Sequence, residues 1–275
     1  MAGPGLSRWA VPTAIAVVVV AGLVLRFWTR SDLWLDEALT VNVARLPLRR
    51  LSAGLRHDGA PPLYYLLLHA WMRVFGTGDV AVRSLSALFG IAALPVAWVA
   101  GRDLAGRRAG WIALVLLASS PYAIRYSTET RMYTLVMLLV LLGWVAVWRS
   151  LERPTPARLG AVALVSGMLL LTHYWSLYLL AVLEAALVWR WRREPKASNA
   201  GRVALAVVGG GVLLLPWLPD MVFQLRHTGT PWAQPATFRA LVNAVSEFGG
   251  GIQDEGRGLG DRFPRPGARV AAGPE

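Results

Sequence analysis

The sequence predicts an all-α protein built as a bundle of membrane-spanning helices. Hydrophobic residues occupy 55% of the 275 positions and charged residues only 16%, and apolar runs recur from Val11 to Pro219. The arginines lie mainly at the ends of these runs. This pattern is typical of multispan membrane proteins rather than of a soluble domain with one core.

The first span is expected in the apolar run from Trp9 to Trp28. About 20 residues at 1.5 Å each match a hydrocarbon core of about 30 Å. A cleaved signal peptide is the alternative. However, the run is longer than the usual apolar region of such a peptide and continues into Arg26-Phe27-Trp28 without a small-residue cleavage site. We therefore interpret the run as a permanent span.

Short basic connections predict the orientation of the later spans. They cover residues 102–108, 149–158 and 190–202. Positively charged loops favour the cytoplasmic side, so all three should be cytoplasmic. Each segment between two of them is too long for one span and has polar residues near its middle, which predicts two hairpins with outward apices. The legs of the first hairpin are expected at 109–124 and 132–148.

Seven spans result when residues 80–101 and a last span at 203–218 are added. Residues 60–76 are not counted, because this segment is short, contains two prolines and is rich in aromatic residues, as in an interfacial or re-entrant segment. It closes a long first outer loop, 29–76. Within this loop arginines and leucines alternate over 46–56, as expected of a helix on a lipid surface. Counting the crossings puts this loop and the hairpin apices on the same, extracytoplasmic side.

The domain prediction is a transmembrane core at 1–230 and a polar tail at 231–275. The tail is rich in Gly, Arg and Pro and has no apolar run, so it is predicted to be disordered, as at the end of a truncated or frameshifted product.

Composition also excludes some function classes. The net charge of +12 arises largely from loop arginines that orient the chain in a lipid bilayer, so no nucleic-acid partner is expected. There is no cysteine, which excludes disulfides and thiolate chemistry. Arginine is used almost throughout in place of lysine, which occurs once, at Lys196. This bias favours a GC-rich, bacterial coding sequence and therefore a bacterial plasma membrane.

Three outward elements carry the side chains that could form a site. They are Asp36, Glu37, His57 and Asp58 in the first loop, Glu129, Arg131 and Tyr133 in the first apex, and His173 and Tyr174 in the second apex. Each alone could be a helix cap, a surface ion pair or an interfacial residue. Together they indicate function, because an ionisable group at membrane depth costs about 2.5–3.5 kcal/mol. Glu184 lies inside an apolar leg without companions, which favours a helix-packing contact.

Acids and cations at the lipid headgroups fit the transfer of a sugar from a lipid phosphate. Phosphate leaves as a stable anion, so one carboxylate base is enough to take the proton of the acceptor hydroxyl, whereas glycosidic hydrolysis uses two carboxyl groups. An arginine such as Arg131 would stabilise the departing phosphate. Several acids near a phosphate could also hold a divalent cation, although no ligand spacing requires one.

Four motifs resemble those of the GT-C glycosyltransferases, in the branch of the dolichyl-phosphate-mannose protein mannosyltransferases and the aminoarabinose transferase of lipid A. The motifs cover residues 33–38, 58–65, 120–133 and 171–174, and their order and spacing match over about residues 10–230. The resemblance implies an integral membrane enzyme with juxtamembrane helices in its first loop. Such an enzyme moves a sugar, mannose or similar, from a polyprenyl-phosphate carrier to a protein, lipid or polysaccharide hydroxyl outside the cell membrane.

The resemblance also implies roles for individual residues. Asp36 falls at the position of the catalytic base, Glu37 is the adjoining acid, and Glu129 matches a second acidic position. Arg131 falls where a contact to the donor phosphate is expected. The other residues implied around the donor sugar and phosphate are His57, Asp58, Tyr64, Tyr133, His173 and Tyr174.

Two other classes of function remain open. A transporter or flippase of lipid-linked sugars would use the same acids to bind substrate without chemistry, although transporter sites tend to lie near the bilayer midplane. An inactive, truncated homologue that acts as a scaffold is favoured by the chain length, because enzymes with these motifs are usually longer. Replacement of Asp36 separates the three: an enzyme loses transfer, a transporter loses uptake, and a scaffold loses neither.

Overall fold

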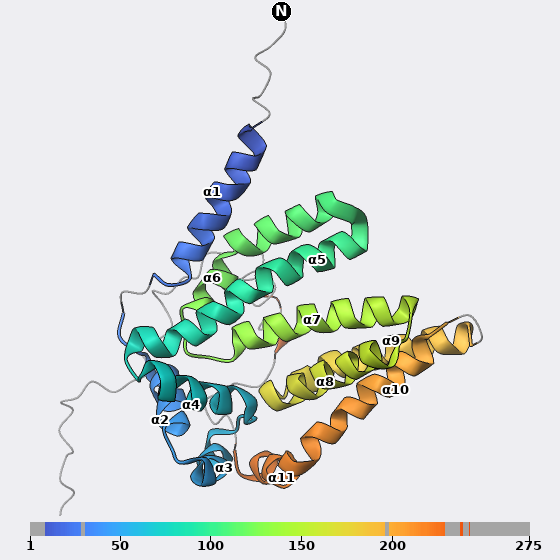
Figure 1. Cartoon of the computed structure of the whole chain (residues 1–275). Helices are drawn as coiled ribbons and strands as arrows, with labels where there is room; N and C mark the ends of the chain where they lie inside the picture. Colours follow the sequence, from blue (N-terminus) through green and yellow to red (C-terminus); the bar gives the residue numbers. More distant parts are fainter. Residues whose placement is uncertain (1–8, 29–30, 196–197, 229–236, 239–241, 243–275) are drawn as a thin grey trace, which may run out of the picture. The chain divides into compact units, whose positions relative to one another are not determined.

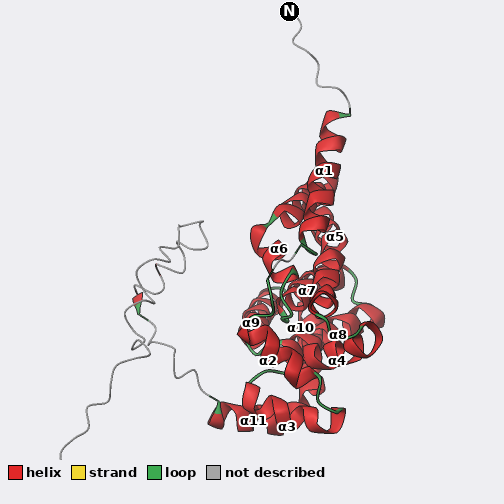
Figure 2. Cartoon of the chain, turned by 90° about the vertical axis from the view of Figure 1, so that its left-hand side faces the viewer, coloured by secondary structure: helices red, strands yellow, loops and turns green. Residues whose placement is uncertain are grey.

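The computed structural model describes residues 9–28, 31–195 and 198–228, with residues 237, 238 and 242 beyond them. The chain divides into two units, Met1–Gly229 and Thr230–Glu275. The predicted polar tail, 231–275, therefore lies almost entirely outside the described residues. The described part is helical and contains no strand (Figures 1 and 2), which confirms the predicted all-α fold.

The helices follow one another with short connections. In chain order they are α1 (Ala10–Leu25), α2 (Leu35–Ala44), α3 (Leu48–Asp58), α4 (Leu63–Phe75), α5 (Asp79–Ser119), α6 (Pro121–Ser127), α7 (Tyr133–Glu152), α8 (Pro156–Thr172), α9 (Ser176–Arg193), α10 (Ala200–Gly210), the 3₁₀ helix η1 (Gly211–Trp217) and α11 (Leu218–His227).

Turns occur where the basic connections were predicted. Helix α5 is interrupted at Ala105 and Gly106, and Gly106 has a φ of 83°, which glycine adopts without strain. The chain turns back there, so α5 supplies two legs of a hairpin (Figure 1). The legs pack so closely that a Cβ atom on Gly101 would lie 2.7 Å from the Ala109 carbonyl oxygen. Helices α7 and α8 meet at the second basic connection, and α9 and α10 meet at the third.

Within the described residues, three helical stretches are long and apolar enough to cross a membrane: Asp79–Ser119, Tyr133–Glu152 and Ala200–His227. The apolar helices α1 and α8 are shorter, at 16 and 17 residues. Each of the seven predicted spans coincides with a helix or with one leg of α5, in the predicted order. How many of these helices cross a membrane remains a prediction.

Two predicted boundaries differ from the structure. The leg expected at 109–124 ends at Ser119, because Ser120 and Pro121 begin the short helix α6. Proline fits the first turn of a new helix but cannot continue the previous one. The last span, expected at 203–218, changes to a 3₁₀ helix at Gly211 and continues as α11 beyond Pro219.

The first outer loop folds into α2, α3 and α4, as the resemblance implies. At 1.5 Å per residue the 13 residues of α4 reach about 20 Å, which is less than a hydrocarbon core. Tyr64, Tyr65 and Leu68 of α4 are buried. In α3 the leucines Leu51 and Leu55 are buried, whereas Arg49, Arg50 and Arg56 are exposed. Helix α11 packs along α3 (Figure 2) and completes this layer.

Arg26 joins the first helix to the second leg of α5. Its guanidinium is 1% exposed and donates hydrogen bonds to the carbonyl oxygens of Leu117, at 2.8 Å, and Ala118, at 3.1 Å. Pro121 has no N–H to offer the Leu117 carbonyl four residues earlier, so an arginine from another helix supplies the donor. This contact anchors the point from which the first outer loop departs.

Candidate functional site

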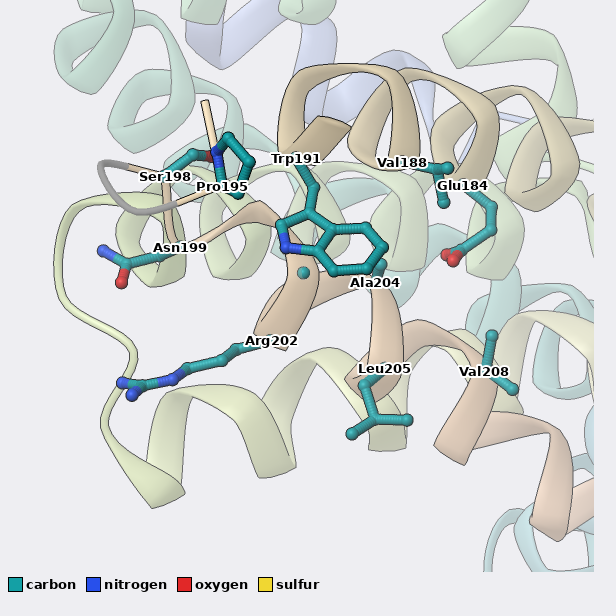
Figure 3. A pocket seen from close by; sticks show the side chains of 11 residues that line it. Glu184, Val188, Trp191, Pro195, Ser198, Asn199, Arg202, Ala204, Leu205 and Val208 are labelled. Atoms are coloured by element: carbon teal, nitrogen blue, oxygen red, sulfur yellow. The ribbon is translucent and has the colours of Figure 1, made fainter. Parts of the chain in front are cut away.

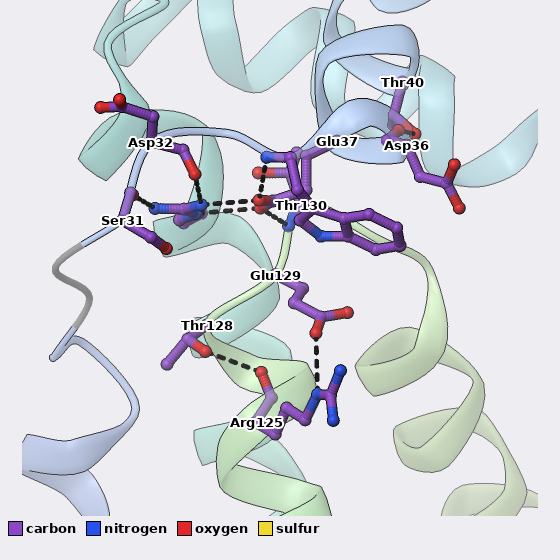
Figure 4. A network of polar contacts seen from close by, with 11 residues as sticks. Ser31, Asp32, Asp36, Glu37, Thr40, Arg125, Thr128, Glu129 and Thr130 are labelled. Atoms are coloured by element: carbon purple, nitrogen blue, oxygen red, sulfur yellow. Dashed lines mark hydrogen bonds and ion pairs between the residues drawn. The ribbon is translucent and has the colours of Figure 1, made fainter. Parts of the chain in front are cut away.

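A buried ion pair joins the first loop, the first hairpin apex and α5. Glu37 of α2 is 0% exposed and accepts two hydrogen bonds from Arg83 of α5, at 2.9 and 2.6 Å. Arg83 also donates to the backbone oxygens of Ser31, at 2.6 Å, and Asp32, at 3.0 Å. Arginine suits this position because its planar fork of donors matches a carboxylate. The pair therefore fixes the loop after α1 against α5 (Figure 4).

Glu37 also holds the first hairpin apex. The backbone N–H of Thr130 donates to one carboxylate oxygen at 2.7 Å, and the N–H of Trp34 donates to the other at 3.3 Å. A carboxylate has about four acceptor positions, and four donors now occupy those of Glu37. Burial raises the pKa of Glu37, but the hydrogen bonds from Arg83, Thr130 and Trp34 outweigh it and hold the pKa below its usual value. Glu37 is thus an ionised group with no acceptor position left for a substrate.

Asp36 is exposed where its neighbour is buried. Its side chain is 42% exposed and points away from the Glu37 cluster (Figure 4). The carboxylate oxygen Oδ2 lies 3.8 Å from a terminal nitrogen of Arg131. The structure therefore brings a free carboxylate of the first loop next to a cation of the first apex, although 95 residues separate them along the chain.

The Arg131 side chain is only 15% exposed and is held by other contacts. It donates to the Thr40 hydroxyl at 3.1 Å and to the Asp36 carbonyl oxygen at 3.4 Å, and its Cζ atom lies 5.9 Å from the centroid of the Tyr133 ring. Its Nε atom is buried and has no hydrogen-bond partner within the described residues. One donor of this guanidinium is therefore unsatisfied close to Asp36.

Aromatic side chains continue from Arg131 toward the second apex. The Tyr133 ring lies 4.7 Å from that of Tyr126 and 6.2 Å from that of His173, centroid to centroid. His173 ends helix α8, and its Nδ1 atom accepts a hydrogen bond from the Trp175 N–H at 3.2 Å. The neutral imidazole therefore carries its proton on Nε2. Burial and the Arg131 charge both lower the pKa of His173.

This pKa shift predicts a loss of stability in acid. The unfolded chain, in which the pKa is near 6.5, takes up the proton before the folded chain does. The contribution of neutral His173 is complete above that pH and is lost as the pH falls through the lower folded-state pKa. We expect acidification from about pH 7 to about pH 5 to lower the midpoint of thermal unfolding more in the wild type than in His173→Gln. An equal decrease in the two proteins would contradict the assignment.

The predicted tyrosines of α4 contact the site through other residues. The Tyr64 hydroxyl lies 2.8 Å from the Ser86 hydroxyl, which donates to the Arg131 carbonyl oxygen at 3.1 Å. The Tyr65 hydroxyl donates to the Asp58 carboxylate. Burial and the Asp58 charge raise the pKa of Tyr65, so it remains a neutral donor. Tyr64 is 1% exposed, and its contact with the first apex is therefore indirect.

Three predicted site residues have their partners elsewhere. His57 is exposed and packs edge-on against Phe223 of α11, with ring centroids 6.3 Å apart. The Tyr174 hydroxyl donates to Gln224 of α11 and accepts from the Trp217 indole at 2.9 Å. The Glu129 carboxylate turns toward Arg125 of its own apex, at 3.2 Å (Figure 4). These contacts connect α3 and the turn after α8 with η1 and α11, or close the apex itself.

Sequence reasoning missed Arg83 and Thr40. Arg83 had a recognisable signal, because it is a lone cation inside the predicted span 80–101, and such groups mark functional contacts. Thr40 had none, since threonine four residues after an acid is common. No group of three or more His, Asp or Glu residues that could hold a metal ion occurs within the described residues. The positive charge next to the Asp36 carboxylate within the described residues is that of Arg131.

This combination of apolar helices with a carboxylate and a guanidinium in the loops at one end is the arrangement expected of a membrane glycosyltransferase. The sequence model of the family described as dolichyl-phosphate-mannose-protein mannosyltransferase matches residues 59–218, more than half of the chain. The chain belongs to this family and is a membrane glycosyltransferase of the GT-C type. No curated protein matches the chain significantly. The matched range contains Glu129, Arg131 and His173, and Asp36 and Glu37 precede it.

Proposed function

We propose that the protein is a hexosyltransferase or pentosyltransferase that transfers a sugar, mannose or similar, from a polyprenyl-phosphate carrier to a hydroxyl group of a protein, lipid or polysaccharide. The observation that carries the proposal is the exposed Asp36 carboxylate 3.8 Å from Arg131. A base and a cation side by side are what this reaction needs, because a proton leaves the acceptor while negative charge develops on the phosphate.

In the proposed reaction an Asp36 oxygen accepts the proton of the acceptor hydroxyl. The hydroxyl oxygen then forms a bond to the anomeric carbon, and the bond from that carbon to the phosphate oxygen breaks. The electron pair of the broken bond stays on the phosphate, whose added charge Arg131 stabilises. Tyr133 and His173 would line the sugar, and the Nε2 proton of His173 is a donor for a sugar hydroxyl. Asp36 afterwards returns its proton to solvent.

The remaining acids have supporting roles in this proposal. Glu37 positions Asp36 rather than reacting, because its acceptor positions are occupied. Glu129, paired with Arg125, would form the rim next to the donor. Asp58 would act through Tyr65, and His57, Tyr64 and Tyr174 would hold the helices around the donor rather than contact it.

We also propose that the site is extracytoplasmic, in the plasma membrane of a bacterium. The basic turns at 102–108, 149–158 and 190–202 lie at the helix ends opposite to those that carry Arg131 and His173. Positive loops favour the cytoplasmic side, which would leave the site outside.

The test is the release of polyprenyl phosphate by the purified protein in the presence of a labelled donor. Polyprenyl-phosphate mannose and other lipid-linked sugars would be supplied separately with peptide and glycolipid acceptors. Donor-dependent release together with labelled acceptor supports the proposal. Movement of intact donor across vesicles without release would instead identify a flippase.

Replacing Arg131 with lysine tests the phosphate contact. Lysine keeps the charge but loses the planar fork, so we expect transfer to decrease about tenfold. The matched control is Arg125→Lys, whose side chain is 72% exposed in a surface ion pair, and we expect it to stay within about twofold of wild type. Equal rates for the two variants would remove Arg131 from the reaction.

A further inference from the structure

A pocket separate from the Asp36 site lies between α9 and α10, next to the basic connection of these helices (Figure 3). It has a volume of about 510 Å³, and its walls include Glu184, Val188 and Trp191 from α9 and Leu205 and Val208 from α10. Helix α9 begins beside His173 and ends at Arg193, so the pocket lies toward the end of α9 remote from the Asp36 site. The proposed reaction makes no use of it.

Glu184 is the acidic group in the lining of this pocket. Its Oε2 atom is buried and has no hydrogen-bond partner within the described residues. The sequence favoured a helix-packing role, but the carboxyl group turns into the space between the two helices (Figure 3). An ionisable group inside an apolar helix is costly unless something pairs with it. A ligand that donates a hydrogen bond to Glu184 would therefore bind favourably, because it supplies the partner that the described residues do not.

Trp191 forms the neighbouring wall. A Cβ atom on Gly201 would lie 3.0 to 3.2 Å from three atoms of the indole ring, so the ring packs against α10 where a side chain would not fit. Glu184 and Trp191 are seven residues apart, which is about two helical turns and places them on one face of α9. An aromatic face attracts an ammonium cation, and a carboxylate accepts strong hydrogen bonds from it, so the two groups together suit such a ligand.

We propose that this pocket binds a primary ammonium group carried on an apolar body. The ammonium would donate hydrogen bonds to Glu184 and face the Trp191 ring, while Val188, Leu205 and Val208 contact the apolar part. The nearest cation of the lining, Arg202, extends away from Glu184 (Figure 3). Glu184 offers no positive charge to an anion, whether it is protonated or ionised. A metal ion would lack ligands, because no second acid or histidine among the described residues lines the pocket. The inference is independent of the transferase chemistry.

Labelling of Glu184 by dicyclohexylcarbodiimide tests the site. A protonated carboxyl group adds across a C=N bond of the reagent, and the O-acylisourea rearranges to a stable N-acylurea that mass spectrometry detects. A carboxylate paired with ammonium does not react. The full chain would be reconstituted in phosphatidylcholine nanodiscs, with phosphatidylethanolamine or dodecylammonium added in separate arms. We expect about tenfold less labelling of the Glu184 peptide at an ammonium concentration of about ten times the dissociation constant.

The two arms distinguish the sources of the ammonium. Protection by phosphatidylethanolamine indicates a lipid headgroup, and protection by dodecylammonium alone indicates a free amphiphilic amine. Trp191→Leu should weaken protection about fivefold. Glu184→Gln should abolish the adduct, and Glu194→Gln, at the end of the same helix and outside the pocket, should leave it unchanged. Labelling that neither amine reduces, or no labelling in phosphatidylcholine alone, would overturn the proposal.

Discussion

The Asp36→Asn variant is expected to lose sugar transfer by about 10²–10⁴-fold while it folds normally. Asparagine has nearly the same shape but cannot accept the acceptor's proton. The Asp36 side chain is 42% exposed and has no buried hydrogen bond to lose, so its replacement should not alter the unfolding temperature. The measurement is the initial rate of labelled acceptor formation, with donor binding measured in parallel.

Asp32 provides the matched control for this experiment. It is an exposed carboxylate in the same loop, and its contact with Arg83 uses the backbone oxygen rather than the side chain. Asp32→Asn removes the same charge four residues from Asp36 and should keep the rate within about twofold of wild type. If Asp36→Asn retained the rate of Asp32→Asn, Asp36 would not be the base. If both variants lost activity together, net loop charge rather than a proton acceptor would explain the result.

Helix positions could be predicted from the sequence because they depend on local signals. Apolar runs of fixed length, separated by arginine-rich turns, predict where helices begin and end. The error at Ser120 has the same local origin, since a proline that starts a new helix resembles one that lies inside a leg. The positions of the three helices of the first loop relative to a membrane do not follow from the sequence, because amphipathic segments this short do not specify whether they cross, enter or lie on a membrane.

The sequence does not predict that Glu37 is buried while the adjacent Asp36 is exposed. Successive residues of an α-helix point about 100° apart, so one of two adjacent acids can be buried while the other faces solvent. Which one is buried depends on Arg83, 46 residues later in another helix, and on Thr130, 93 residues away. The motif indicated that this pair of acids matters. Only the contacts of α2 with Arg83 of α5 and with the Thr130 N–H of the apex separate the proposed base from the group that positions it.

The Arg83–Glu37 pair should therefore be the largest single contribution to the integrity of the site. Arg83→Leu leaves Glu37 ionised and buried without its main partner, and such a change costs about 3–5 kcal/mol. We expect a decrease of that size in the free energy of unfolding in detergent, measured by chemical denaturation. The control is Arg125→Leu, which breaks the pair with Glu129. The Arg125 side chain is 72% exposed and that of Glu129 is 13% exposed, so we expect this loss to be at most about 1 kcal/mol and smaller than that of Arg83→Leu.

The double variant separates the effect of the ion pair on folding stability from its effect on the position of Asp36. In Arg83→Leu with Glu37→Leu no charge remains buried, so much of the lost stability should return, as it does when both members of a buried pair become apolar. Transfer should not return with it, because neither the Ser31–Asp32 segment nor the Thr130 N–H would have a partner to hold Asp36 beside Arg131. A stable but inactive double variant would assign the pair to positioning. Recovery of both stability and transfer would mean that the loops meet without it, and additive losses would mean that the two side chains act independently.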